Sequence, residues 1–386
     1  MNPDTSAPPS RPAWIEVDLS RLRANYRCIE VARDSKVGFI AVIKDDAYGH
    51  GAAAVAREAV KAGARWLALA TIEEAQLLRR AGINAPILML GQRHPAEIEE
   101  CVRLRLSCAV ADETTATLVN AESARQGAIT GLHLKVDTGM NRYGVRWNQA
   151  ADLVPRLLHL PHVRLEGVFS HFAMSDELDK TYARLQLARF RHALEQIEST
   201  GWNGGVRHFC NSGGFLDLPE AHFDLVRIGL LPLGVYPSQV CRRLPDIEPV
   251  MTVKTRLAFI RELEAGDCVG YGMRYTATDR RRIAVLPVGY GDGFPRVRNQ
   301  GDVLVRGKRA PLIGGVAMDA ITIDITHIPE AQLWDEAVLM GRQGTEQISV
   351  HDVAKLKGSV SYDVLTSWRE RLPRVYLGAV SQGECP

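Results

Sequence analysis

Short apolar strands alternate with helical segments over residues 37–230, and this alternation constrains the fold more than any other feature. Eight strand candidates occur there: Val37–Ile43, Trp66–Ala70, Pro86–Leu90, Ser107–Ala111, Thr130–Val136, Arg164–Ser170, Val206–Cys210 and Phe223–Ile228. Apolar residues recur between them with helical spacing, in the stripes Ala52, Val55, Ala56, Ala59, Val60 and Leu187, Phe190, Leu194, Ile197. Thr71 and Glu74 have the spacing of a capping box. The pattern predicts a (β/α)8 barrel, with an open doubly wound sheet as the alternative.

The sequence changes character after about residue 245, where short β-rich runs are separated by glycine-rich turns. The strand candidates in this part are Leu257–Ile260, Ile283–Val288, Val303–Arg306, Ala320–Ile325 and Ala337–Met340. Residues 1–12 are polar and carry four prolines. We therefore expect a disordered tail over 1–12, a barrel over 13–244 and a mostly β domain over 245–386.

Composition narrows the range of partners and compartments. The chain has 386 residues, which suggests two domains, and its net charge of +2 points to neither nucleic acid nor an anionic membrane surface. Seven cysteines without paired spacing predict neither a disulfide framework nor a metal site. No segment has the pattern of a signal peptide or the length of a membrane span. We expect a reduced, cytoplasmic protein without a metal.

Reactive residue types follow the predicted barrel strands. The strand ends carry Lys44, then Lys135 with Asp137 and Arg142, then Ser170-His171, Asn211-Ser212-Gly213-Gly214, and Arg227-Ile228-Gly229. In a (β/α)8 enzyme the chemistry lies at the carboxyl ends of the strands. A lysine after Ala41-Val42-Ile43 is either a solvated strand end or an amine used chemically, for example in an imine with an aldehyde cofactor.

Two further patterns bear on the site. Ser212 and the glycines after it follow the seventh strand, next to Gly229 after the eighth, where barrels commonly hold a phosphate. In the fifth strand Lys135 alternates with apolar residues, so its ammonium should point into the barrel. An interior cation needs either a carboxylate such as Asp137 or a modified amine.

With these residues placed, the chain resembles the alanine racemases over nearly its whole length. The matching segments are Ala41–Gly51, Lys135–Gly144, Ser170–Ala173, Asn211–Gly213, Val226–Gly229, Gly270–Tyr275, Pro287–Gly293, Gly315–Asp319 and Ser361–Tyr362. The resemblance implies a fold-type III enzyme. It would have a TIM-type barrel followed by a β domain, pyridoxal 5'-phosphate as the cofactor, and a head-to-tail homodimer whose β domain completes the partner's active site.

The resemblance also implies residue roles. Lys44 bonds to the cofactor aldehyde and serves as the base on the D face, and Tyr271 of the partner serves the L face. His171 and Arg227 form a chained pair behind that tyrosine, and Arg227 contacts the pyridine nitrogen. The implied cofactor contacts are Lys44, Tyr48, Arg142, His171, Asn211, Ser212, Arg227, Gly229 and Tyr362.

Substrate contacts are implied for Arg142 and for the backbone amide of Met318. Lys135 is implied as a candidate for carbamylation, which would turn an interior cation into an anion that orients Arg142. Tyr290 and Asp319 would line the access route, with roles in turn formation and packing as the alternative.

The chain departs from the family pattern at Asp45, at Leu231-Pro232-Leu233-Gly234 and at Ala317. By strand parity Asp45 points away from Lys44, so its effect on the lysine pKa should be modest. We expect an alanine racemase that supplies D-alanine for peptidoglycan. The alternatives are serine or broad amino-acid specificity, a cofactor-binding protein without turnover, and a decarboxylase.

Overall fold

The computed structural model describes residues 11–379 and divides them into two compact units. The barrel unit consists of Arg23–Ala47 and Ala52–Ile247. The β unit consists of the described residues up to Leu22, the short segment Tyr48–Gly51, and the described residues from Glu248 onward. Within residues 11–379, no helix combines the length and apolarity needed to cross a membrane.

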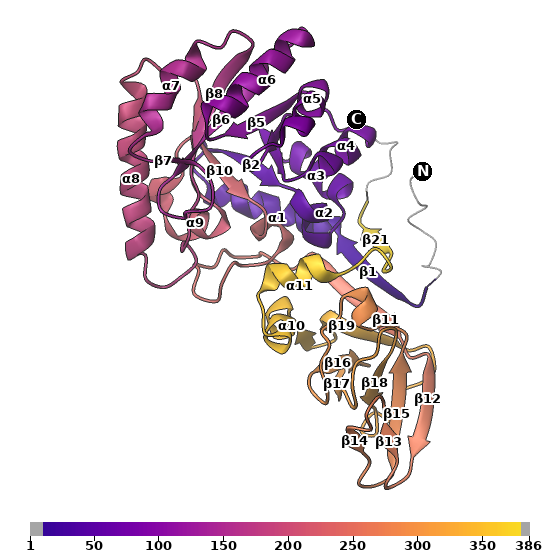
Figure 1. Ribbon diagram of the computed structural model, residues 1–386. Coiled ribbons are helices and arrows are strands. Elements are labelled where there is room, and N and C mark those ends of the chain that lie inside the picture. The colour runs from indigo at the N-terminus through magenta and orange to yellow at the C-terminus, as the bar shows by residue number, and fades with distance from the viewer. Residues whose placement is uncertain (1–10, 380–386) are drawn as a thin grey trace, which may run out of the picture. The chain divides into compact units, whose positions relative to one another are not determined.

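Eight parallel strands close into a ring and confirm the predicted (β/α)8 barrel (Figure 1). They are β2 (Gly38–Val42), β3 (Trp66–Leu69), β4 (Ile87–Met89), β5 (Leu106–Val110), β6 (Thr130–Asp137), β8 (Val163–Phe169), β9 (Val206–His208) and β10 (Leu225–Ile228). Each pairs with the next in this order, and β10 pairs with β2, which closes the ring. Each of the eight strands overlaps its predicted segment. A two-residue strand, β7 (Val145–Arg146), adds to β6.

Helices precede, connect and follow the barrel strands. They are α1 (Leu19–Ala32), α3 (Ala52–Lys61), α4 (Ile72–Arg80), α5 (Pro95–Arg103), α6 (Glu113–Arg125), α7 (Ala150–Leu158), α8 (Thr181–Glu198), α9 (Ser212–Asp217), η1 (Pro219–Ala221) and η2 (Leu231–Leu233). The predicted stripe of α8 is buried throughout, whereas Val60 of α3 is 39% exposed, so that stripe is one residue too wide. Thr71 and Glu74 form the expected capping box of α4.

The barrel interior changes from apolar to polar toward the carboxyl ends of its strands. An apolar cluster of Ile40, Ala68, Leu88 and Leu225 comes from four neighbouring strands. The polar side chains described below come from residues nearer the strand ends. A packed interior with chemistry confined to one end is the usual arrangement of this fold.

The β unit contains three sheets, the α-helices α10 and α11, and the short 3-10 helix η3. Its elements are β1 (Ala13–Asp18), β11 (Met251–Arg256), β12 (Phe259–Leu263), β13 (Cys268–Val269), β14 (Tyr275–Thr276), β15 (Arg281–Leu286), η3 (Tyr290–Asp292), β16 (Asp302–Val305), β17 (Lys308–Pro311), β18 (Ile321–Asp324), β19 (Glu336–Gln343), β20 (Glu346–Ile348), α10 (Val350–Lys357), α11 (Ser361–Ser367) and β21 (Arg374–Leu377). One sheet has the order β17-β16-β19-β11-β1-β21, with β20 on β19, and the others are β12-β15-β18 and β13-β14.

Four of the five strand predictions in this unit are confirmed, and Leu257–Ile260 is confirmed only in its last two residues, which begin β12. The chain changes sheets there, because β11 ends at Arg256 and β12 begins at Phe259. Leu257 is fully buried in the link, and its amide bonds the carbonyl of Asp335. An apolar run therefore marks a buried crossing between two sheets.

The N-terminal strand β1 pairs with β11 and β21 and with no barrel strand. The strand accordingly belongs to the β unit, whereas the expected barrel began at residue 13. Residues 1–10 of the expected disordered tail lie outside the described residues. Pro12 is anchored on β11, because its carbonyl accepts from Arg256 N at 3.0 Å and Thr255 Oγ1 at 2.8 Å.

Candidate active site

The turn that begins at Lys44 is left-handed. In α2 (Lys44–Gly49), the φ angles of residues 45–48 lie between +51° and +54°, and Gly49 has φ +78°. A left-handed helical conformation costs about 1–2 kcal/mol for each residue with a side chain. Such backbone strain persists only where the surroundings enforce it, and it is concentrated at functional sites.

Carboxylates hold this turn in place. Glu74, at the start of α4, accepts from the backbone N–H of Asp45, of Ala70 at 2.8 Å and of Thr71 at 3.1 Å. Asp46 accepts from the Ala52 amide at 2.7 Å. One side chain therefore both caps a helix and fixes the residue next to Lys44.

The environment of Lys44 lowers the pKa of its amine below the usual 10.5. Partial burial is the largest cause and the positive charge of Arg142 is the next, while the carboxylates of Glu74 and Asp45 act in the opposite direction. Burial and Glu74 in turn raise the pKa of Asp45. The lysine is thus more readily neutral, and so more nucleophilic, than an exposed one.

Arg227 lies almost fully buried at the end of β10 and donates to four groups. Nη1 lies 2.9 Å from His208 Nδ1, and Nη2 lies 3.0 Å from His171 Nδ1. Nη2 also contacts the carbonyls of Ser170 at 2.7 Å and Phe209 at 2.9 Å. Burial lowers the pKa of Arg227 to about 10, so the side chain remains a cation at neutral pH. The expected contact between His171 and Arg227 is therefore present.

The guanidinium fixes the tautomers of the histidines around it. Since arginine can only donate, Nδ1 of His208 and of His171 must accept, which places the proton of each neutral ring on Nε2. His208 Nε2 then donates to His133 Nδ1 at 2.9 Å. Burial and the charge of Arg227 lower the pKa of all three imidazoles, which keeps them neutral at physiological pH.

Lys135 points into the barrel, as its place in β6 predicts. The side chain is 7% exposed, and Nζ lies 4.7 Å from the ring centroid of Phe169. Burial, Arg227 and Arg142 lower its pKa well below 10.5, against the opposing effect of Asp137. No ion pair joins Lys135 to a carboxylate in the described part of the chain. The neutral form of this amine is thus more accessible than that of an exposed lysine.

Hydrogen-bond donors gather in the loops after β9 and β10. Ser212 Oγ lies 3.4 Å from Gly229 N and 3.5 Å from Leu231 N. Asn211 caps α9 by accepting from Gly214 N at 2.9 Å. Together with a lysine of lowered pKa and a buried arginine, these donors fit an aldehyde cofactor that carries a phosphate.

Tyr48 and Tyr362 both belong to the β unit. Gly49, the residue after Tyr48, packs closely against α11, the helix that carries Tyr362. A Cβ at Gly49 would lie 2.5 Å from the carbonyl oxygen of Leu365 in that helix. Arg374 Nε also contacts the Gly49 carbonyl at 3.2 Å. The contacts hold the backbone next to Tyr48 against the helix that carries Tyr362.

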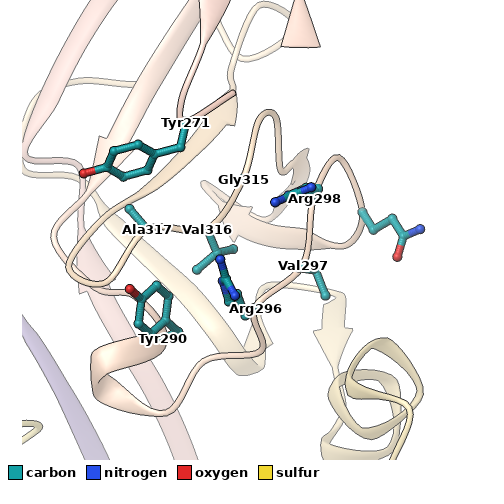
Figure 2. A pocket seen from close by; sticks show the side chains of 9 residues that line it. Tyr271, Tyr290, Arg296, Val297, Arg298, Gly315, Val316 and Ala317 are labelled. Atoms are coloured by element: carbon teal, nitrogen blue, oxygen red, sulfur yellow. The ribbon is translucent and has the colours of Figure 1, made fainter. Parts of the chain in front are cut away.

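A second group of expected residues lies on the surface of the β unit. Tyr271 is 84% exposed and Met318 is 51% exposed. A cavity of about 490 Å³ is lined by Tyr271, Tyr290, Arg296, Val297, Arg298, Gln300, Gly315, Val316 and Ala317 (Figure 2). Arg296 lies over the Tyr290 ring at 5.7 Å. These residues belong to the β unit, whereas Lys44, Lys135, His171 and Arg227 belong to the barrel unit.

The sequence analysis missed several polar residues of the barrel site, namely His133, His208 and Glu74 acting beyond its helix cap. His208 lies at the end of β9, where strand-end reasoning could have found it. Glu74 and Asp45 could not be related from sequence, because their contact joins the turn α2 to the start of α4, 29 residues apart.

Comparison with known proteins gives a consistent result. Residues 17–237 match the alanine racemase N-terminal domain and residues 250–376 match the alanine racemase C-terminal domain. The chain is 42% identical over 370 residues to an alanine racemase of Symbiobacterium thermophilum, covering 95% of this chain and 98% of that protein. It is also 42% identical over 356 residues to one of Syntrophobacter fumaroxidans, covering 92% and 95%.

Solved structures agree. Alanine racemase of Clostridium difficile 630 superposes with a TM-score of 0.91 at 32% identity, over 95% of this chain and 96% of that chain. That of Bacillus anthracis with bound L-Ala-P superposes with a TM-score of 0.90 at 34% identity, over 98% and 97%. Both domains are matched in order and almost completely. The chain belongs to the alanine racemase family.

Proposed function

We propose that this protein interconverts L- and D-alanine with pyridoxal 5'-phosphate as its cofactor. The observation that carries the proposal is the environment of Lys44: an amine of lowered pKa, on a strained turn at the carboxyl end of a barrel strand. Family membership supports the same chemistry. When bound, the cofactor withdraws electrons from the substrate α-carbon and thereby acidifies its proton.

Two bases are needed, because a racemase must add and remove a proton on both faces of one flattened carbon. Lys44 serves the D face, where its readily neutral amine accepts the proton. Tyr271 of a partner subunit serves the L face. The exposure of Tyr271, at 84%, supports this division, since the side chain is available to a second copy of the chain.

His171 supports the tyrosine. A phenol is a weak base at neutral pH unless a donor stabilises its ionised form. Because His171 Nδ1 accepts from Arg227, its Nε2 carries a proton that can be donated to such a phenolate.

Arg227 limits the reaction to proton transfer. A guanidinium that stays charged would donate to the pyridine nitrogen of the bound cofactor without handing over its proton. Arg227 would thereby keep electron withdrawal by the ring weak, which would favour simple proton return over side reactions.

The remaining residues bind and orient. Ser212, Gly229, Tyr48 and Tyr362 hold the phosphate, with Asn211 shaping the loop beside it. Arg142 contacts the cofactor phenolic oxygen and the substrate carboxylate, to which Met318 of the partner offers its amide. Tyr290 and Asp319 line the access route.

Lys135 is proposed to be carbamylated, with its neutral amine adding to CO2 and releasing one proton. The product is an anion in place of an interior cation, beside Arg142. A ¹³C NMR carbamate signal from protein equilibrated with ¹³C-bicarbonate, lost in Lys135→Ala, tests this modification.

The central experiment measures chiral products from single amino acids, with and without added cofactor. Lys44→Ala and Tyr271→Phe should each lower racemisation about 10²- to 10⁴-fold, the range for loss of a general base. Tyr275→Phe, in the same unit, is the matched control. Turnover of serine but not alanine would replace the substrate assignment, and an amine product would indicate a decarboxylase.

In the cell, we propose a cytoplasmic homodimer that supplies D-alanine for peptidoglycan. The cysteines support a reduced compartment, because the six in the described residues are all free thiols. Sedimentation with and without cofactor tests the dimer.

A further inference from the structure

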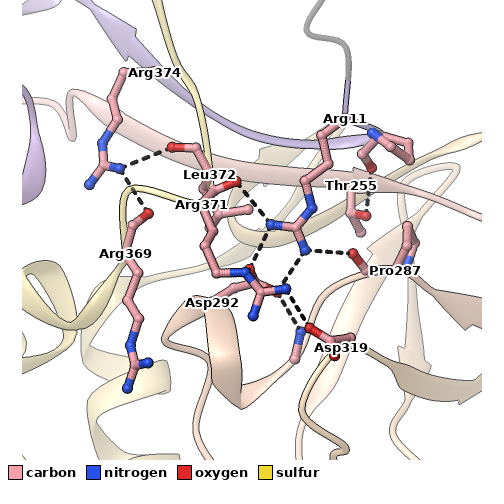
Figure 3. Close-up of polar contacts among 11 residues, drawn as sticks. Arg11, Thr255, Pro287, Asp292, Asp319, Arg369, Arg371, Leu372 and Arg374 are labelled. Carbon is pink, nitrogen blue, oxygen red and sulfur yellow. Dashed lines mark hydrogen bonds and ion pairs between the residues drawn. The ribbon is translucent and has the colours of Figure 1, made fainter.

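A cluster of two arginines and two aspartates joins the N-terminal arm to two loops of the β unit (Figure 3). At its centre is Asp292, whose carboxylate is fully buried. Arg11 donates from Nη1 to Oδ1 at 2.6 Å and from Nη2 to Oδ2 at 2.9 Å, which is a two-pronged pair. Arg371 lies 3.4 Å from the same carboxylate and also pairs with Asp319. We call these four residues the arginine–aspartate cluster.

The cluster holds two loops, 287–293 and 315–319, which interlock through backbone contacts. Tyr290 N donates to the Ala317 carbonyl at 3.1 Å, and Gly291 N donates to the Met318 carbonyl at 2.9 Å. The approach is so close that a Cβ at Gly289 would lie 2.1 Å from the Ala317 oxygen. A shift of one loop must therefore move the other.

Arg11 also donates to two backbone carbonyls of the β unit. Nη1 contacts the carbonyl of Arg371 at 2.9 Å, and Nη2 contacts the carbonyl of Pro287 at 3.1 Å. Asp292 also accepts from Gly289 N at 3.0 Å. One guanidinium thus fixes a buried carboxylate, the start of the first loop and the segment that carries Arg371.

We propose that Arg11 is a positioning residue for substrate binding: it holds the interlocked loops so that the Met318 amide and Tyr290 keep the placement that the substrate requires. The proposal rests on the proposed function for the role of Met318. Arginine is needed because its planar fork satisfies both carboxylate oxygens, whereas the lysine ammonium is a single point charge.

The test compares Arg11→Ala and Arg11→Lys with Arg306→Ala in the full chain. Arg306 is a matched control, since it makes the same kind of two-pronged pair with Asp335, at 2.5 and 3.1 Å, away from the two loops. The first readout is amide hydrogen exchange of residues 287–293 and 315–319 in cofactor-free protein. The second is KM and kcat for alanine.

Both Arg11 variants should raise exchange in the two loops at least about tenfold, while Arg306→Ala leaves it unchanged. Arg11→Ala should also lower kcat/KM roughly 10- to 100-fold, mostly through KM. The double variant Arg11→Ala with Asp292→Asn should be more stable than Arg11→Ala, because it removes the buried charge that has lost its partner. Its KM should stay as high as that of Arg11→Ala.

Equal exchange in all variants would overturn the proposal. An equally large rise in KM in Arg306→Ala would also overturn it. If the protein racemises no amino acid, the proposed function fails, and the exchange measurement still decides whether Arg11 orders the loops. If Arg11→Ala does not fold, Arg11→Lys carries the test.

Discussion

Arg227 Nη1 lies 2.9 Å from Nδ1 of His208, and this contact orders the protons of the barrel interior. Because the guanidinium can only donate, His208 must carry its proton on Nε2. That Nε2–H donates to His133 Nδ1, so His133 also carries its proton on Nε2. Two neutral rings, His208 and His171, thus contact the buried cation, and His133 extends the hydrogen-bond chain from His208 without adding charge.

We predict that His208 and His171 give ¹⁵N NMR signals of the neutral Nε2–H tautomer from pH 5 to 8, because burial and Arg227 lower both pKa values well below 6.5. Free histidine in the same buffer serves as the reference for a ring that protonates across this range. Signals of an Nδ1–H tautomer or of imidazolium at pH 7 would contradict the arrangement.

Stability should fall in acid because of the buried imidazoles. Burial lowers the pKa of His133 from 6.5 to about 3, so between these pH values the unfolded chain binds a proton that the folded chain does not. The contribution of the neutral His133 to the free energy of unfolding is therefore complete above pH 6.5 and is lost as the pH falls toward 3.

Each such histidine adds up to about 1.4 kcal/mol per pH unit to the slope of unfolding free energy. His133→Gln should therefore give a shallower slope in denaturant unfolding between pH 6 and 4. His159→Gln, at an exposed position, tests whether loss of any imidazole has the same effect. An unchanged slope in His133→Gln would argue against this source of acid sensitivity.

Gly49→Ala should destabilise the β unit by about 1–3 kcal/mol or more, because φ there is +78° and the new Cβ would lie 2.5 Å from the Leu365 carbonyl. Gly63→Ala is the matched control: φ is +87°, with nothing within 4 Å of the added carbon. Denaturant unfolding of both variants separates the backbone strain from the steric contact. A larger loss for Gly63→Ala would contradict this account.

Removing Asp45 or Glu74 should lower the pKa of Lys44 further, since both carboxylates oppose its depression. Asp45→Asn and Glu74→Gln keep the size of each side chain and remove its charge. The pH dependence of Lys44 acylation in cofactor-free protein, followed by peptide mass mapping, measures the shift. Asp152→Asn, in α7, controls for loss of any acidic charge. A higher pKa in either variant would reverse the assigned signs.

Regular patterns and strand-end positions could be predicted from sequence. Eight short apolar runs predicted the barrel, and their carboxyl ends pointed to Lys44, His171 and Arg227 as candidates. Lys44 and His171 directly follow a predicted strand, and Arg227 is the next-to-last residue of one. Lys135 was placed in the interior by alternation alone. These features depend on neighbours along the chain, which a sequence displays directly.

Contacts between distant segments could not be predicted in this way. Arg11 meets Asp292 across 281 residues, and β1 joins a sheet built mainly from the far end of the chain. The left-handed turn after Lys44 was also missed, because Asp45-Asp46-Ala47-Tyr48 carries no glycine to signal it. Strain of this kind is set by the surroundings.

The pairing of β1 with β21 bears on how the protein is made. Ile15 lies beside Arg374 in a parallel pair, so the sheet closes between segments 359 residues apart in sequence. During synthesis on the ribosome, the barrel unit can be complete before β11 and β21, the two strands that pair with β1, have been made. Contacts of such long range form slowly. Among the strands of residues 11–379, β21 is thus synthesised after all the others, and it covers an edge of β1 that is unpaired until then.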